Sequence, residues 1–216
     1  MTMHRTTLAY WLLAFLLAPL SAWAEYTEGV EYIAIRPQPV ETGSKIEVRE
    51  FFWYGCPHCY HLEPGLTAWR KTLTSKAEFV RSPAIFRETW GVHARAYFAL
   101  QTLGVSEKLD SAVFKAIHEQ DRPLDSEKSL TAFVVEQGVD GKRFSDAFHS
   151  FSMENSLKRA VELQKAYGIT SVPTLVVDGR YITSPSLAHG NEAVLKVLDF
   201  LVNKAAQERK KNPSSR

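Results

Sequence analysis

The only two cysteines of the chain lie close together, where a run of apolar residues ends. Residues 46–54 first alternate between apolar and polar side chains and then become apolar, which is typical of a central β-strand. The run stops at Gly55, and residues 56–59, Cys-Pro-His-Cys, follow at once. Proline is favoured in the first turn of a helix, where its missing N–H needs no partner. The sequence therefore predicts a buried strand that turns directly into a helix, with the cysteine pair in the first helical turn.

This placement gives the two cysteines different chemistry. Cys56 would lie at the helix N-terminus, where unpaired backbone N–H groups and the helix dipole stabilise a thiolate. Cys59 would lie one turn further in, on the same face, and would act as the less exposed resolving thiol. Pro57 fixes the turn, and His58 can add positive charge near the Cys56 sulfur. Stabilising the thiolate favours the reduced form, so the pair predicts an oxidising Cys56–Cys59 disulfide that needs no separate cofactor.

Two other roles for the pair are weighed against this one. A structural disulfide across so short a loop restricts the unfolded chain little, and is therefore a poor stabiliser. A zinc site could use Cys56, His58, Cys59 and His61. Structural zinc sites usually take their ligands from two separated pairs, however, and these four lie on little more than one helical turn. We therefore expect no metal.

The first 24 residues resemble a cleaved signal peptide. Arg5 supplies a positive charge, residues 8–20 are apolar or weakly polar, and Ala22-Trp23-Ala24 fits an A-x-A cleavage site. The apolar run is short for a membrane span, which needs about 20 residues, although an uncleaved anchor is the alternative. We expect an exported protein that is cleaved near Ala24. In an oxidising compartment, a lone cysteine pair is more consistent with a reactive centre than with a set of structural disulfides.

Length and composition fit a globular protein. The chain has 216 residues, of which 45% are hydrophobic and 23% charged, enough for one large domain or one domain with an insertion. The formal net charge of +2 is too small to indicate a nucleic-acid partner. The one dense basic cluster is Arg209 to Lys211, and we expect residues 205–216 to form a disordered basic tail.

The order of predicted elements indicates an α/β domain that is interrupted by helices. A helix from residue 57 to about residue 73 carries Pro64-Gly65, where we expect an interruption, and residues 77–84 form a second strand. Residues 86–166 show helical spacing throughout, with Asn155 as the expected N-cap of the last helix in this block. We therefore assign 86–166 to an all-helical insertion domain, and 25–85 with 167–204 to one discontinuous α/β domain.

The chain after the helical block returns to strands. Asp178-Gly179 divides the apolar residues of 174–183 and predicts a β-hairpin, and a final amphipathic helix follows from Asn191. Val172-Pro173 opens the first of these strands, and from the sequence alone an ordinary trans bond is the better interpretation. Glu50 shares strand parity with Val48, so it should point into a packed layer. It could hold a proton for a thiol or be a core acid paired with a base, and both interpretations remain open.

Several motifs together resemble the DsbA family of periplasmic thiol–disulfide oxidoreductases. They are Glu50-Phe-Phe-x-x-x-Cys-Pro-His-Cys-Tyr60 and Gly168-Ile-x-x-Val-Pro-Thr174, combined with the predicted export. The resemblance covers nearly all of the chain after the signal peptide, and it implies a thioredoxin-like fold that is interrupted by a helical domain. It also implies that Val172-Pro173 is a cis pair facing the disulfide and that Glu50 is the acid beneath it. Pro64-Gly65 departs from the family pattern and puts the path of that helix in doubt.

The resemblance implies a function as well. Such proteins donate their disulfide to reduced, newly exported proteins in the periplasm, and they bind an extended substrate by strand addition beside the cis-proline. A quinone-linked membrane partner of the DsbB type would reoxidise the disulfide, and nothing in the sequence requires more than a monomer. The alternatives are an isomerase or reductase on the same fold, or a chaperone that does not use its thiols. Isomerases generally carry a preceding dimerisation domain, whereas only about 20 residues after the signal peptide precede the first strand here.

Overall fold

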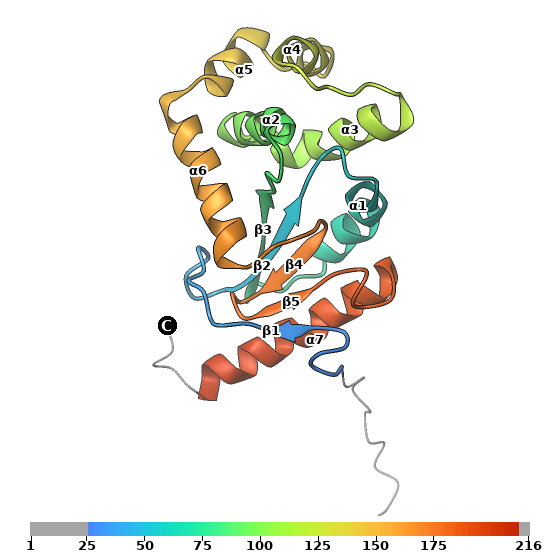
Figure 1. Cartoon of the computed structure of the whole chain (residues 1–216), viewed down its shortest axis with the longest axis vertical. Helices are drawn as coiled ribbons and strands as arrows, with labels where there is room; N and C mark the ends of the chain where they lie inside the picture. The colour runs from blue at the N-terminus through green and yellow to red at the C-terminus, as the bar shows by residue number, and fades with distance from the viewer. Residues whose placement is uncertain (1–25, 212–216) are drawn as a thin grey trace, which may run out of the picture.

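The computed structural model describes residues 26–211, so the predicted signal peptide lies outside the described residues. The chain forms a five-stranded sheet with strand order β1-β5-β4-β2-β3 (Figure 1). The strands are β1 (Ile33–Ala34), β2 (Ile46–Phe52), β3 (Ala77–Pro83), β4 (Thr174–Val177) and β5 (Tyr181–Thr183). The β2 and β3 strands are parallel, and the other neighbouring pairs are antiparallel.

The central strand β2 is buried along its whole length. A strand covered on both faces has no solvent side, so its charged residues Glu47, Arg49 and Glu50 are buried together with the apolar ones. The predicted hairpin joins β4 to β5, with Asp178 and Gly179 at φ values of 55° and 66°. Such left-handed backbone at both central residues is what a tight two-residue hairpin turn requires.

Helices cover the sheet and fill the long connection between β3 and β4. They are α1 (Pro57–Arg70), the 3-10 turn η1 (Glu88–Trp90), α2 (Gly91–Thr102), α3 (Ser106–Glu119), α4 (Glu127–Glu136), α5 (Gly141–Phe148), α6 (Phe151–Ala166) and α7 (Asn191–Lys211). Helices α1 and α7 pack on one face of the sheet around Leu62, Leu66 and Leu198. The end of α6 leads to the other face, where Tyr167 packs against Phe51. The observed order is the predicted one, an α/β domain with a helical insertion.

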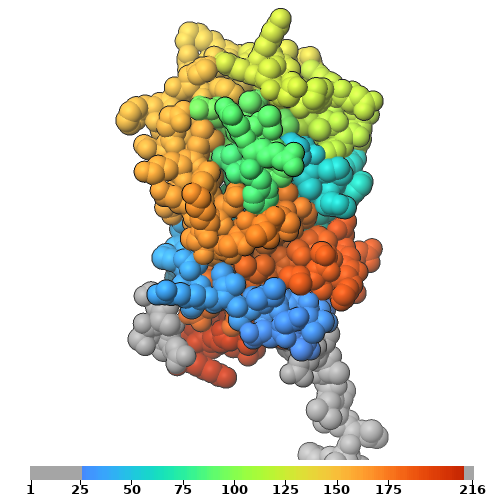
Figure 2. All heavy atoms as spheres, in the orientation of Figure 1, coloured from blue at the N-terminus to red at the C-terminus, as the bar shows by residue number. Residues whose placement is uncertain are grey.

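The inserted helices share their apolar core with the cysteine turn. One continuous cluster contains Cys56 and Cys59 together with Phe114 of α3, Leu130 of α4 and Phe144 of α5. In Figure 2 the green and yellow-green atoms of the helical insertion lie against the cyan segment that includes α1. The cysteine turn is therefore enclosed by the inserted helices as well as by the sheet.

Three boundary expectations differ from the structure. Helix α1 continues through Pro64 and ends at Arg70, before the expected end at about residue 73, so Pro64-Gly65 does not end the helix. Helix α6 begins at Phe151 after Ser150, so Asn155 lies inside the helix and is not its cap. The expected tail from residue 205 is wrong up to Lys211, because α7 continues to that residue.

Side-chain anchoring explains the longer last helix. Arg209 donates to the buried carboxylate of Asp178 and to the carbonyl oxygens of Gly43 and Ser44. Residues 212–216 lie outside the described part of the chain. Among residues 26–211, none of the helices combines the length and apolar character needed to cross a bilayer.

Candidate active site

The turn between β2 and α1 places Cys56 at a helix N-terminus. Cys56 is the N-cap residue, with extended backbone angles of φ −87° and ψ 116°, and Pro57 is the first helical residue. The Cys56 N–H donates to the carbonyl oxygen of Trp53 at 3.0 Å, which closes the turn. Cys56 is 7% exposed and Cys59 is fully buried, so the first thiol is the one that a partner can reach.

Both thiols are free in this structure, and their pKa values are shifted in opposite directions. A hydrogen bond from the Cys59 thiol lowers the pKa of Cys56 to about 6, with help from the backbone N–H groups of Cys59 and His58 and from the charge of His58. Burial opposes this effect but does not cancel it. Burial raises the pKa of Cys59 well above that of a free thiol, and the negative charge of Glu50 adds to the increase. The arrangement therefore favours one thiolate, at Cys56.

The loop before β4 lies against the Cys56 sulfur. The Val172-Pro173 peptide bond is cis, so the trans interpretation from the sequence alone is wrong and the expectation from the resemblance is confirmed. The Cys56 thiol donates to the Val172 carbonyl oxygen, with 3.5 Å between Sγ and O. Pairing of Phe51 with Thr174 in the β2–β4 ladder brings this loop beside the end of β2. Backbone polar groups of Val172 are thus next to the reactive sulfur.

Glu50 fits both of its open interpretations. It is 1% exposed, and it accepts a hydrogen bond from Arg81 Nε at 2.7 Å across the β2–β3 pair. Burial raises the pKa of Glu50 to about 7, with a contribution from the negative charge of Glu63, while the Arg81 charge acts in the opposite direction. Glu50 is a core acid with a basic partner, and a pKa raised to about 7 suits it to hold or release a proton near neutral pH. Its negative charge also raises the pKa of Cys59.

Sequence reasoning missed the polar residues that surround Glu50. Arg81 also forms ion pairs with Glu63 of α1 and with Asp110 of α3, the latter at 3.1 Å. Asp110 in turn accepts a hydrogen bond from the Tyr54 hydroxyl at 2.5 Å. The sequence offered one signal, an arginine in the predicted strand at residues 77–84, because an arginine that is buried in a strand needs an acidic partner. Only the strand register identifies that partner as Glu50.

The residues that flank the turn form a layer of aromatic rings. Trp53 stacks on Trp90 with 4.0 Å between ring centroids, and Phe86 packs edge-on against Trp90 at 5.2 Å. On the other side, His118 stacks on Tyr60 at 4.9 Å. These rings hold the turn between η1 and α3, which leaves few conformations open to the segment that carries Cys56.

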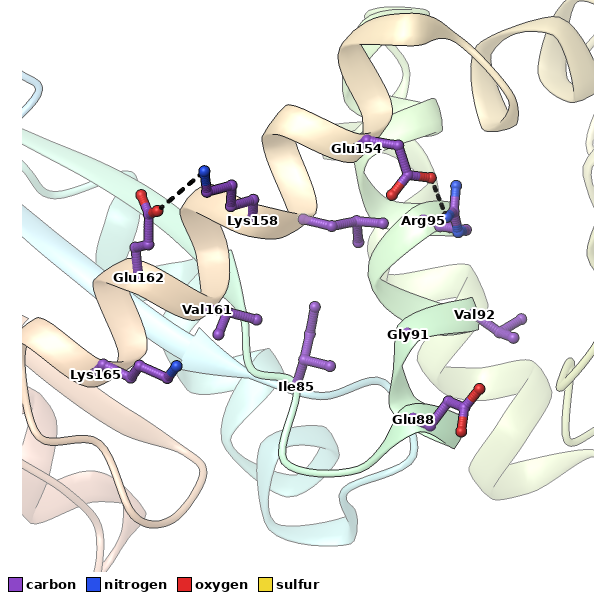
Figure 3. A pocket seen from close by; sticks show the side chains of 11 residues that line it. Ile85, Glu88, Gly91, Val92, Arg95, Glu154, Lys158, Val161, Glu162 and Lys165 are labelled. Carbon is purple, nitrogen blue, oxygen red and sulfur yellow. Dashed lines mark hydrogen bonds and ion pairs between the residues drawn. The ribbon is translucent and has the colours of Figure 1, made fainter.

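A groove on the described surface lies away from the two cysteines. It has a volume of about 650 Å³ and runs between α6 and the segment from Ile85 through the start of α2 (Figure 3). Ile85 and Val161 form part of its apolar floor, and the ion pairs Lys158–Glu162 and Arg95–Glu154 lie along its rim. No predicted site residue lines it. Within residues 26–211, groups of three or more acidic, histidine or cysteine side chains with a metal-binding arrangement are absent.

Comparison with known proteins agrees with this geometry. The family model described as "DSBA-like thioredoxin domain" matches residues 47–202. The Thiol:disulfide interchange protein DsbA of Pseudomonas aeruginosa is 39% identical over 188 residues, covering 87% of this chain and 89% of the relative. The protein of the same name from Burkholderia cepacia is 43% identical over 175 residues, covering 81% of this chain and 82% of the relative.

Solved structures show the same similarity. The crystal structure of Pseudomonas aeruginosa DsbA superposes with a TM-score of 0.82 at 39% identity, covering 86% of this chain and 97% of that one. The oxidoreductase DsbA from Xylella fastidiosa gives a TM-score of 0.79 at 33% identity, covering 84% and 98%. The expected thioredoxin-like fold with a helical insertion is therefore confirmed, and the chain belongs to the DsbA family of thiol:disulfide oxidoreductases.

Proposed function

We propose that this protein oxidises pairs of thiols in reduced, exported proteins by giving up a Cys56–Cys59 disulfide. The observation that carries the proposal is that the pKa values of the two thiols are shifted in opposite directions: that of Cys56 is lowered to about 6 and that of Cys59 is raised. A sulfur that is stable as a thiolate is a good leaving group and favours the reduced form of the pair. The disulfide form should therefore be the stronger oxidant.

The reaction has two exchange steps. A substrate thiolate attacks Cys56 Sγ, the Cys56–Cys59 bond breaks, and Cys59 leaves with the electron pair and takes up a proton. The second substrate thiolate then attacks the substrate sulfur of the mixed disulfide, and Cys56 leaves as a thiolate. The substrate loses two electrons and gains a disulfide, and the enzyme pair is reduced.

Each predicted site residue has a place in this scheme. Pro57 starts the helix whose N–H groups face Cys56, and His58 adds its charge beside the same sulfur. Glu50 is suited to supply or accept the Cys59 proton, because its pKa of about 7 lets it exist in both forms near neutral pH. The backbone at Val172-Pro173, next to Cys56 Sγ, is suited to bind an extended substrate segment by strand addition.

The cellular setting of the proposal comes from the family and from the sequence. A cleaved signal peptide over residues 1–24 would deliver the protein to the periplasm. A quinone-linked membrane oxidoreductase of the DsbB type would restore the disulfide after each cycle. The redox-active disulfide itself would serve as the cofactor.

The decisive experiment compares two single variants. Cys56→Ser should abolish oxidation of a reduced model protein, and its remaining thiol should react slowly with iodoacetamide at neutral pH. Cys59→Ser keeps the low-pKa thiol and should be alkylated quickly, which makes it the matched control. Retained oxidase activity in Cys56→Ser would refute the proposal. Rapid repair of a scrambled substrate combined with slow oxidation of a reduced one would instead indicate an isomerase.

A further inference from the structure

A buried cation lies between three carboxylates from three different elements. Arg81 of β3 pairs with Glu50 of β2 at 2.7 Å, with Asp110 of α3 at 3.1 Å, and with Glu63 of α1. The four side chains are between 1% and 7% exposed. Asp110 is the only one of the four that comes from the inserted helices. The cluster therefore joins the helical insertion to the strand that leads to the cysteines.

The charges in this cluster do not balance. With every group ionised, three carboxylates around one guanidinium carry a net charge of −2, which is costly inside a protein. Like charges held so close cannot all ionise near neutral pH, so at least one carboxyl group keeps a proton. The question is which of the three carries it.

The hydrogen-bond donors identify the protonated carboxyl group. Glu63 accepts from Ser111 and Thr67, each at 3.0 Å, in addition to Arg81. Asp110 accepts from the Tyr54 hydroxyl as well as from Arg81. Among residues 26–211, the donor to Glu50 is Arg81 alone. Since donors stabilise the ionised form, Glu50 is the group left with the proton.

Asp110 controls how much of Arg81 is available to Glu50. Its Oδ2 atom accepts a hydrogen bond from Arg81 Nη1, and its Oδ1 atom accepts one from the Tyr54 hydroxyl. Tyr54 lies two positions before Cys56. A neutral side chain at this position would leave Arg81 with two acidic partners and the cluster with one less negative charge. Glu50 would then ionise more readily.

We propose that Asp110 is a positioning residue for the thiol chemistry, because by occupying part of Arg81 it keeps Glu50 protonated and able to donate to the departing Cys59 thiolate. In the exchange step the S–S bond electrons go to Cys59 Sγ, the Glu50 proton follows them, and the resulting Glu50 carboxylate is neutralised by Arg81. This inference rests on the proposed function and adds a residue from the helical insertion to it.

Asp110→Asn leaves the other charged and titratable groups around Glu50 unchanged. They are Glu63 and Arg70 of α1, Arg81 of β3, Tyr97 of α2, Tyr54 of the turn, and Cys59. The pKa of Glu50 at about 7 and the raised pKa of Asp110 agree with one shared proton in this region. Changing Asp110 alone thus isolates its effect on Glu50.

The test follows the rate of oxidation of a reduced peptide against pH, by stopped-flow fluorescence, for the full chain. In Asp110→Asn the pH at which the rate begins to fall on the alkaline side should decrease by about one unit, as expected for the loss of one adjacent like charge. At each pH the rate of the variant is divided by the rate of the parent protein with the same peptide, so the effect of peptide-thiol ionisation on the rate cancels. Asp146→Asn, which removes an exposed carboxylate paired with Lys142, should leave the profile unchanged.

A second set of variants, made in a protein that already carries Glu50→Gln, separates an effect on the Glu50 proton from an effect on the structure. In Glu50→Gln the Asp110→Asn change should produce no further displacement of the pH profile, since the group through which it acts is gone. Tyr54→Phe removes one donor from Asp110 and should move the profile in the same direction by a smaller amount, so it serves if Asp110→Asn does not fold. An unchanged profile in a folded Asp110 variant, or an equal displacement in the Glu50→Gln background, would overturn the inference. Normal oxidation by the parent protein in either case would leave the proposed function intact.

Discussion

Ionisation of Cys56 should make the stability of the reduced protein depend on pH. The folded pKa of about 6 lies well below the value of about 8.5 for a free thiol, so folding favours the thiolate. A lowered pKa adds stability that is complete above the unfolded value and is lost as the pH falls through the folded value. From pH 5 to pH 8 the contribution should rise by about 2.5 kcal/mol, or by about 1 kcal/mol after allowance for solvent screening at a helix end.

The measurement is urea unfolding of the reduced protein and of reduced Cys56→Ser at several pH values. The difference in unfolding free energy between them should be smallest at about pH 5 and should grow steadily towards about pH 8. Subtracting the variant also removes the opposite contribution of Cys59, whose raised pKa costs stability once the unfolded chain can ionise it.

Cys59→Ser is the matched control for this experiment. It keeps the Cys56 thiol and a hydroxyl donor beside it, so it should retain most of the pH dependence. A difference between the parent and Cys56→Ser that stays flat across this range would show that the Cys56 thiolate is not stabilised by the fold. The argument for an oxidising disulfide would then fail.

Three further substitutions test the surroundings of the site. Arg81→Met removes the cation from three buried carboxylates and should cost about 3–5 kcal/mol in urea unfolding at neutral pH, and less in acid, where the carboxyl groups are protonated. Gly55→Ala would place a Cβ 2.3 Å from the Trp53 ring, so we expect a changed tryptophan fluorescence spectrum and a loss of about 1–3 kcal/mol. Arg209→Ala removes the hydrogen-bonded cation of buried Asp178, leaving only the longer ion pair with Arg180, and should lower stability by about 1–3 kcal/mol in thermal unfolding.

The parts of the structure that could be predicted are those encoded by neighbouring residues. The β2 strand, the helix start at Pro57 and the hairpin at Asp178-Gly179 each depend on a few consecutive side chains. The position of Cys56 at a helix N-terminus followed from the same local pattern. Local propensity was enough at these places because burial and backbone preference favour the same conformation.

The missed features depend on contacts between distant segments. Ser150 and Asn155 are both good helix caps, and the burial of Met153 in the first turn of α6 favours the earlier start. The partners of Glu50 could not be read from the sequence, because Arg81 is 31 positions away and reaches it only through the β2–β3 register. Asp110 joins the cluster only when α3 folds back onto the sheet.

Helix α3 of the insertion contacts the turn before Cys56 through two atoms of Tyr54. On α3, Asp110 accepts a hydrogen bond from the Tyr54 hydroxyl, and His118 Nε2 donates to the Tyr54 carbonyl oxygen at 2.8 Å. Tyr54 is separated from Cys56 by Gly55 alone, so a displacement of α3 would move the backbone that positions the nucleophile. The same helix supplies Phe114 to the apolar cluster that contains both cysteines. The position of the reactive thiol thus depends on the helical insertion as well as on the thioredoxin-like sheet, whereas the acidity of Cys56 comes from Cys59 and His58 in the first turn of α1.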